Sequence, residues 1–176
     1  EEAIRLEPDY ARAWARLGRY YFRSALQGWI GDRDAGFEKA LEYCERAVKA
    51  DPAEWEGQAY LAMAMIFGTH AFGPGNYHAL EAVRLHPSAP AARHGCGCVL
   101  EWLGEADQAL LHLRAIFDLN PNYPNRAAAL GDMTTCELFA GHIEEAVNSA
   151  RQLRNIAPEY CRGLQRIVVT LGHAGK

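Results

Sequence analysis

The sequence lacks the features that would point to a membrane, an export pathway or a nucleic acid. No apolar run among its 176 residues approaches the roughly 20 residues that a membrane-spanning helix requires. It opens with EEAIR rather than with a basic patch and an apolar segment, so no export signal is expected. Lys and Arg number 18 against 22 Asp and Glu, which leaves no basic excess for phosphate contacts. We therefore expect neither a membrane nor a nucleic acid as a partner.

The number of cysteines is odd. The five cysteines are Cys44, Cys96, Cys98, Cys136 and Cys161. Disulfide frameworks of secreted domains use even numbers, and a chain of this length builds a core without such links. Free thiols, and with them a cytoplasmic location, are the expectation.

Motifs that would mark an enzyme are also missing. The sequence holds no phosphate-binding loop, nucleophile elbow or zinc-protease signature. Its one metal-like cluster is His94-Gly95-Cys96-Gly97-Cys98. On a helix the two thiols point about 200° apart, so they cannot join one tetrahedral ion. We expect no catalytic, cofactor-binding or metal-ligating residue, and hence no enzyme and no cofactor.

What the sequence does contain is an internal repeat, marked by prolines at 44-, 35-, 34- and 37-residue intervals. The prolines are Pro8, Pro52, Pro87, Pro121 and Pro158. The residues five and two positions before each proline are apolar throughout. Proline bars the preceding residue from helical geometry, so each proline predicts the end of a helix. The segment 37–50 also has apolar residues at 3.6-residue spacing, which is typical of an amphipathic helix.

This pattern resembles the tetratricopeptide repeat (TPR), a helix–turn–helix unit with a period of about 34 residues. The first full repeat carries the pattern best, in Trp14, Leu17-Gly18, Tyr21, Ala40, Cys44, Ala47 and Pro52. The resemblance implies an all-α fold, a right-handed α-solenoid of helix–turn–helix repeats. We expect one domain over residues 1–176, with no strand. It divides into the end of a preceding repeat (1–8), four full repeats (9–52, 53–87, 88–121, 122–158) and the first helix of a fifth (159–176).

Three departures from the period predict local irregularities. Ten extra residues at 24–33 are expected to form a flap over the first helix pair, although an exposed Trp29-Ile30 could instead anchor a partner. Pro74-Gly75 predicts a late helix start with Asn76 as the N-cap. Both ends fall in mid-repeat, which predicts either a fragment of a longer protein or self-association through the ends. At the last helix this leaves four apolar residues without a cover: Leu164, Ile167, Val168 and Leu171.

Binding of another protein is the function that the resemblance implies, with the first helix of each pair lining a concave groove. The expected groove residues are Arg12, Arg19, Phe22, Glu56, Met63, Ile66, His94, Cys98, Glu101, Asn125 and Asp132. Their mixture of apolar and charged side chains suits a peptide or a partner helix. A groove that stays empty while another face binds is the alternative. The positions of a chaperone-type carboxylate clamp keep only Arg162 and Arg166 in the best register, so that ligand is not expected.

The sequence leaves two functions open. One is a non-catalytic scaffold that binds a protein, a peptide or a neighbouring domain of its parent chain. The other is a regulatory or sensory domain of a larger bacterial signalling enzyme or transcriptional regulator. The scaffold is the leading interpretation. The long loop with Gly28-Trp29 is similar to the C-terminal repeat domains of bacterial class III adenylate cyclases, and this resemblance is consistent with the second function, the alternative.

Overall fold

The computed structural model describes residues 2–175, and all its regular elements are helical. No strand occurs among these residues, so the all-α fold class is confirmed. Packing divides the chain into a first unit that ends at Val99 and a second that begins at Leu100. Each unit is described by itself below. No helix within residues 2–175 is long and apolar enough to cross a membrane.

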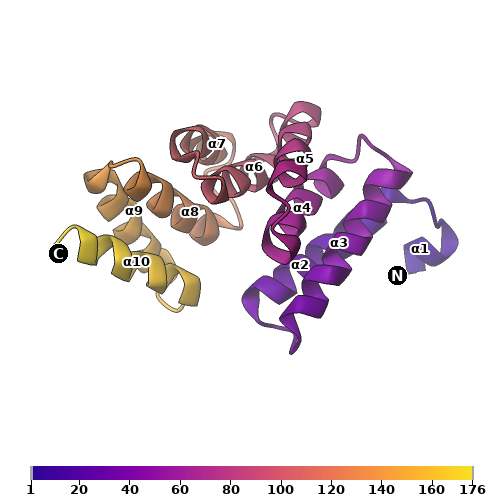
Figure 1. The fold of residues 1–176 in the computed structure, drawn as a ribbon, viewed down its shortest axis with the longest axis horizontal. Coiled ribbons are helices and arrows are strands. Elements are labelled where there is room, and N and C mark those ends of the chain that lie inside the picture. The colour runs from indigo at the N-terminus through magenta and orange to yellow at the C-terminus, as the bar shows by residue number, and fades with distance from the viewer. Residues whose placement is uncertain (1, 176) are drawn as a thin grey trace. The chain divides into compact units, whose positions relative to one another are not determined.

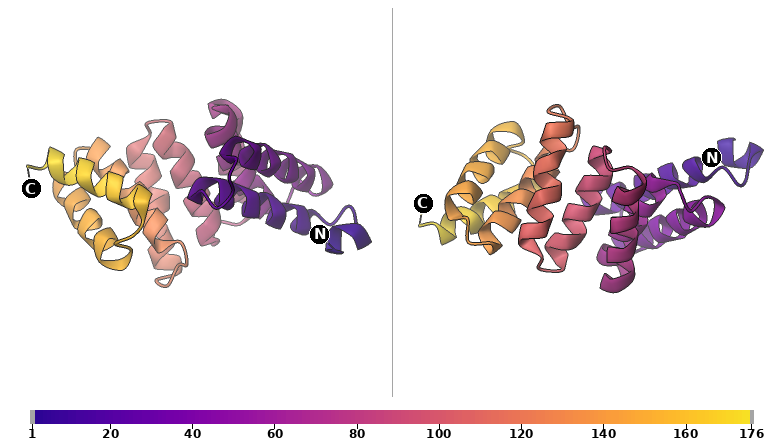
Figure 2. Two further views of the ribbon diagram at one scale, coloured as in Figure 1. Left: turned by 90° about the horizontal axis from the view of Figure 1, so that it is seen from below. Right: turned by 90° about the horizontal axis from the view of Figure 1, so that it is seen from above.

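The first unit consists of successive helices joined by short turns (Figure 1). They are α1 (Glu2–Leu6), α2 (Ala11–Gln27), α3 (Arg33–Ala50), α4 (Trp55–Ala64), the π-helical turn η1 (Met65–Thr69), α5 (Phe72–Leu85) and the first part of α6 (Pro90–Trp102). Helices α2 and α3 pack side by side, and both also contact α4 (Figures 1 and 2). Helix α2 therefore packs both on α3, the second helix of its pair, and on α4, the first helix of the next pair.

A recurring hydrogen bond joins the start of a new helix to the proline before it at four of the five repeat boundaries. A side chain in the first turns of the new helix donates to the proline carbonyl, which no helix bonds satisfy. The pairs are Trp14 with Pro8 at 2.7 Å, Gln58 with Pro52 at 2.8 Å, Arg93 with Pro87 at 2.9 Å, and Arg126 with Pro121 at 3.1 Å. Three different donor types serve this bond, so the sequence pattern conceals it.

The core of the first unit is aromatic where the helices meet. The Phe22 ring lies 5.7 Å from the ring of Phe37, 5.9 Å from Tyr60 and 5.6 Å from Phe67. These separations are typical of edge-to-face and tilted pairs, which add to the area that the rings bury. The contact of α2 with α3 depends on Gly18, because a Cβ there would overlap the thiol of Cys44.

Two of the expected irregularities differ in the structure. Helix α5 begins at Phe72, so the late start with Asn76 as N-cap is wrong. Pro74 is its third residue, where a missing N–H costs nothing because first-turn N–H groups have no helical acceptor. The extra residues near 24–33 mostly lengthen α2 and α3, leaving a loop over 28–32. Ile30 packs against the core next to Gly36, whereas Trp29 is 69% exposed, so only half of this dipeptide covers the helix pair.

The second unit continues the same arrangement. It contains the end of α6, then α7 (Ala106–Leu119), α8 (Arg126–Phe139), α9 (Ile143–Ile156) and α10 (Cys161–His173) (Figures 1 and 2). Gly104 and Gly141 have φ values of 80° and 79°, the left-handed geometry that lets a helix end in a tight turn. Helix α10 packs on both α8 and α9.

Packing of α10 corrects part of the expectation about its apolar residues. Ile167 is only 6% exposed and Leu171 packs against the same core cluster, so these two residues do have a cover. Leu164 and Val168 are 42% and 70% exposed, as expected. Val169, which the sequence did not single out, is also 61% exposed. The helix thus buries one stripe and presents another to solvent.

Candidate partner-binding surfaces

The structure brings some of the expected groove residues together and removes others from reach. In the first unit Arg19 and Glu56 form an ion pair, and Arg12 is exposed. Phe22 and Ile66 are 2% and 1% exposed, so they belong to the core and offer no surface to a partner. Their apolar character places them on the packed edge of each helix rather than on its open face. Met63, at 8%, is nearly as buried.

Glu56 is the buried acid of the first unit. Its side chain lies in the first turn of α4, where the helix dipole favours a negative charge. Arg16 Nε lies 2.8 Å from Oε2, and Arg19 Nη1 donates to Oε1 at 2.9 Å. Both arginines come from α2, so the pairs join consecutive first helices. One carboxylate thus forms ion pairs with two guanidinium groups.

These arginines belong to a stripe of four on one face of α2, at positions 12, 16, 19 and 23. We call this set the arginine stripe. Arg12 and Arg23 form no ion pair within the part of the chain that the structure describes. Beside it opens a pocket of about 230 Å³ whose lining includes Tyr20 and Trp29. The surface therefore combines surplus positive charge with exposed aromatic rings.

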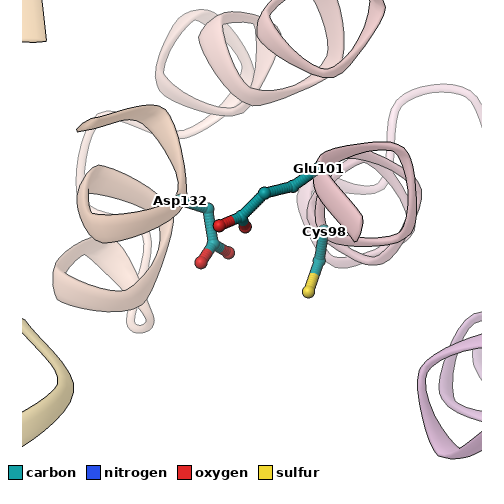
Figure 3. A group of neighbouring side chains, drawn as sticks. All are labelled: Cys98, Glu101 and Asp132. Carbon is teal, nitrogen blue, oxygen red and sulfur yellow. The ribbon is translucent and has the colours of Figure 1, made fainter. Parts of the chain in front are cut away.

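In the second unit Glu101 and Asp132 turn their carboxylates toward one another from α6 and α8 (Figure 3). Cys98 lies one turn earlier on α6. Arg166 of α10 bridges the two acids: Nη2 donates to Glu101 Oε1 at 2.8 Å, and Nη1 donates to Asp132 Oδ1. Gly131 makes room for this arginine, because a Cβ there would lie 2.8 Å from Arg166 Nη1. The guanidinium is thus the cation between the two carboxylates.

Two buried acids face one guanidinium in this cluster. The side chains of Glu101, Asp132 and Arg166 are 8%, 6% and 15% exposed. Burial and the neighbouring Asp132 carboxylate raise the pKa of Glu101 to about 8, although Arg166 and Arg162 oppose the shift. The acid pair therefore holds a proton near neutral pH, in addition to its guanidinium.

A pocket of about 250 Å³ lies next to this cluster, between α8 and α10. It is lined by Glu101, Thr135, Leu138, Phe139, Gln165, Arg166, Val169 and Thr170. Phe139 is 69% exposed at its rim. No group within residues 2–175 donates a hydrogen bond to Glu101 Oε2, which is itself buried. The pocket thus has an apolar rim and a carboxyl group at its floor.

The other expected groove residues contribute less to these two surfaces. His94 and Asn125 are half-buried, and Cys98 is 7% exposed. Helix α6 is continuous through His94, Cys96 and Cys98, so the two thiols keep their helical separation of about 200°. Burial raises the pKa of Cys96 to about 11, which keeps its thiol protonated. None of the five cysteines, all of which lie within residues 2–175, forms a disulfide.

Arg166 is the residue of the acid cluster that the groove assignment missed. It stands 34 residues after Asp132, one repeat period later on the next first helix. Arg19 and Glu56 follow nearly the same spacing, 37 residues apart. A search for opposite charges one period apart on first helices would have found both pairs.

No protein-family model matches the chain, and no curated protein matches it in sequence. Solved structures do match its fold. TTC0263, a TPR protein of Thermus thermophilus, is 20% identical with a TM-score of 0.70, over 97% of this chain and 86% of that one. YrrB, described as a TPR protein with an unusual peptide-binding site, is 18% identical with a TM-score of 0.61, over 99% and 82%. PilF of Pseudomonas aeruginosa is 14% identical with a TM-score of 0.73, over 93% and 68%. The chain therefore has the fold of TPR solenoids.

Proposed function

We propose that the chain is a non-catalytic scaffold that binds a peptide or a partner helix along the first helices of its repeats. At α2 the bound segment is acidic. The observation that carries this proposal is the arginine stripe, with its exposed aromatic neighbours. The fold supports it too, since a protein of similar fold, YrrB, is described as having a peptide-binding site.

Charge complementarity selects the acidic segment. Positions 12 to 23 span about 16 Å along α2, which matches about five residues of an extended peptide. Arg16 and Arg19 both contact the Glu56 carboxylate, while Arg12 and Arg23 form no ion pair within residues 2–175, so the surface keeps a positive surplus. Tyr20 and Trp29, 57% and 69% exposed, offer rigid contact area at low entropic cost. An acidic segment with one or two apolar side chains fits both features.

A peptide-binding experiment tests the proposal on the intact chain. The probe is a fluorescein-labelled peptide of about ten residues containing Glu, Asp, Leu and Phe, and its partner probe carries Lys at each acidic position. Anisotropy at low salt should detect the acidic peptide and not the basic one. The double variant Arg12→Glu/Arg23→Glu should weaken binding at least about tenfold, because it reverses two solvent-accessible charges.

The matched control is Arg151→Glu/Arg154→Glu, which makes the same charge change on exposed residues of α9. Binding should stay within about twofold of the unsubstituted chain, since α9 is a second helix. Equal losses in both double variants would mean that only the net charge matters. That result, or no preference for the acidic peptide, would refute the assignment of α2 as the binding surface.

A further inference from the structure

Glu101 in the second unit is a buried acid that Arg166 contacts through one oxygen only. Arg166 also pairs with Asp132, and the charge of Arg162 on α10 acts on Glu101 as well. Other titratable groups near the two acids, Cys98 on α6 and Cys136 and Glu137 on α8, add no positive charge. A buried carboxylate without a full set of partners is costly, so the site favours a second cation or a proton.

The open acceptor defines what kind of cation fits. Arg166 occupies Glu101 Oε1, while Oε2 is buried and accepts no hydrogen bond from a donor within residues 2–175. A single unsatisfied oxygen suits the compact ammonium group of lysine better than it suits a guanidinium group, because a guanidinium binds best through two parallel hydrogen bonds. The geometry therefore favours a primary ammonium group.

The walls of the pocket define the rest of the ligand. Leu138, Phe139 and Val169 form an apolar rim beside the acid, and the volume is about 250 Å³. A lysine side chain carries its charge on a stem of four methylene groups, which packs along apolar surface while the head stays polar. The exposed ring of Phe139 can also attract a cation through its face.

We propose that this pocket is a receptor for one lysine side chain of a partner peptide, with the ammonium group bound by Glu101 and the stem packed against Phe139 and Val169. The site is separate from the arginine stripe and goes beyond the function proposed for it. Either surface can fail its test without affecting the other, because the two tests use peptides of opposite charge.

Binding at this site competes with a proton, which gives the proposal a signature. The pKa of Glu101 is about 8, raised by burial and by Asp132. Lysine, with a pKa near 10.4, stays charged well above that value. Apparent affinity should therefore rise about tenfold between pH 7 and pH 9, as the ionised fraction of Glu101 rises from about one tenth to nine tenths.

The experiment is an NMR titration of the isotope-labelled chain with two blocked tripeptides, Ac-Ala-Lys-Ala-amide and the same peptide with norleucine in place of lysine. Norleucine keeps the stem and lacks the ammonium group, so it isolates the charge. The lysine peptide should shift the amide signals of Phe139, Arg166 and Val169, more strongly at the higher pH. The norleucine peptide should bind more weakly at both pH values.

Two variants probe the residues involved. Glu101→Gln should abolish the rise with pH and reduce affinity at pH 9 at least tenfold, with its fold checked by the unperturbed amide signals. Phe139→Ala changes an exposed rim residue, so it should fold normally and weaken binding several-fold. Glu144→Gln, an exposed acid at the start of α9, is the matched control and should change nothing.

Three results would overturn the proposal. Equal binding of the norleucine peptide would remove the role of the charge. Unchanged affinity in both Glu101→Gln and Phe139→Ala would move any binding to another surface. Equally strong binding of butylammonium chloride would identify a free amine, rather than a peptide lysine, as the occupant.

Discussion

The buried Glu101 carboxylate should make the second unit less stable in alkaline solution, and the amide variant Glu101→Gln isolates this effect. The folded-state pKa is about 8, well above the ordinary value of 4.5. Between these two values the folded chain holds a proton that the unfolded chain has released. The free energy of unfolding therefore falls as pH rises through this window, and it is highest, for this group, below about pH 4.5.

The magnitude follows from the size of the shift. Each pKa unit corresponds to about 1.4 kcal/mol, so a shift from 4.5 to about 8 gives a ceiling of about 5 kcal/mol at pH 9. Asp132 titrates together with Glu101, and Arg166 relaxes toward whichever acid is charged, so the measured change should be a few kcal/mol. Glutamine has the shape of the protonated acid and cannot ionise. It should match the parent near pH 5 and exceed its stability near pH 9.

Urea unfolding followed by far-ultraviolet circular dichroism measures this difference at about pH 5, 7 and 9. Glu144→Gln serves as the control, because its carboxyl is exposed and its replacement leaves the pH dependence of the parent intact. If Glu101→Gln and the parent lose stability in parallel as pH rises, the acid pair is not the source of the loss, and the reasoning from its burial is refuted.

Two further predictions concern the first unit. Gly18→Ala should destabilise the chain by about 1–3 kcal/mol, because the new methyl group overlaps the Cys44 thiol, and adding Cys44→Ala should recover part of the loss in a double-mutant cycle measured by urea unfolding. Asp32→Ala should cost about 1 kcal/mol, since the Asp32 side chain accepts the Ala35 N–H at 3.0 Å to cap α3. Thermal unfolding checks the second prediction, and Asp34→Ala, an exposed first-turn acid that accepts no cap hydrogen bond, should cost less than half as much.

Helix ends were predictable wherever two signals agreed. Proline after a helix and glycine at a turn both act through local sterics, which a sequence displays directly. The start of α5 was not predictable, because Pro74 is compatible with a loop and equally with the first turn of a helix. Close packing of Gly75 against Ile66 favours the helical start, since a Cβ at position 75 would lie 2.9 Å from Ile66 Cδ1. That contact joins residues whose distance in space the sequence does not give.

The sequence predicted which helices carry the candidate binding residues, but not which of these residues pair with one another. Periodicity placed Arg19, Glu56, Glu101 and Asp132 on first helices, and the structure pairs the first two and joins the last two through Arg166. Periodicity could not distinguish the open face of a first helix from its packed edge, because the two differ by a small rotation of the helix. Phe22 and Ile66 were therefore placed wrongly on the open face. Self-association through the ends and the role as a regulatory domain stay predictions.

The two surfaces follow the same principle. Where first helices meet, the numbers of acidic side chains and of arginines determine the sign of the charge that a bound partner must carry. At Glu56 two guanidinium groups share one carboxylate, so positive charge is left over for a ligand. At Arg166 two carboxylates share one guanidinium, so negative charge is left over once Glu101 loses its proton, above about pH 8. All three acids, Glu56, Glu101 and Asp132, lie on first helices, and the two surfaces differ in whether the additional charged residue is an arginine or an acid. Salt should weaken binding at both surfaces, but only charge-matched peptides should distinguish them, because screening acts on either sign alike.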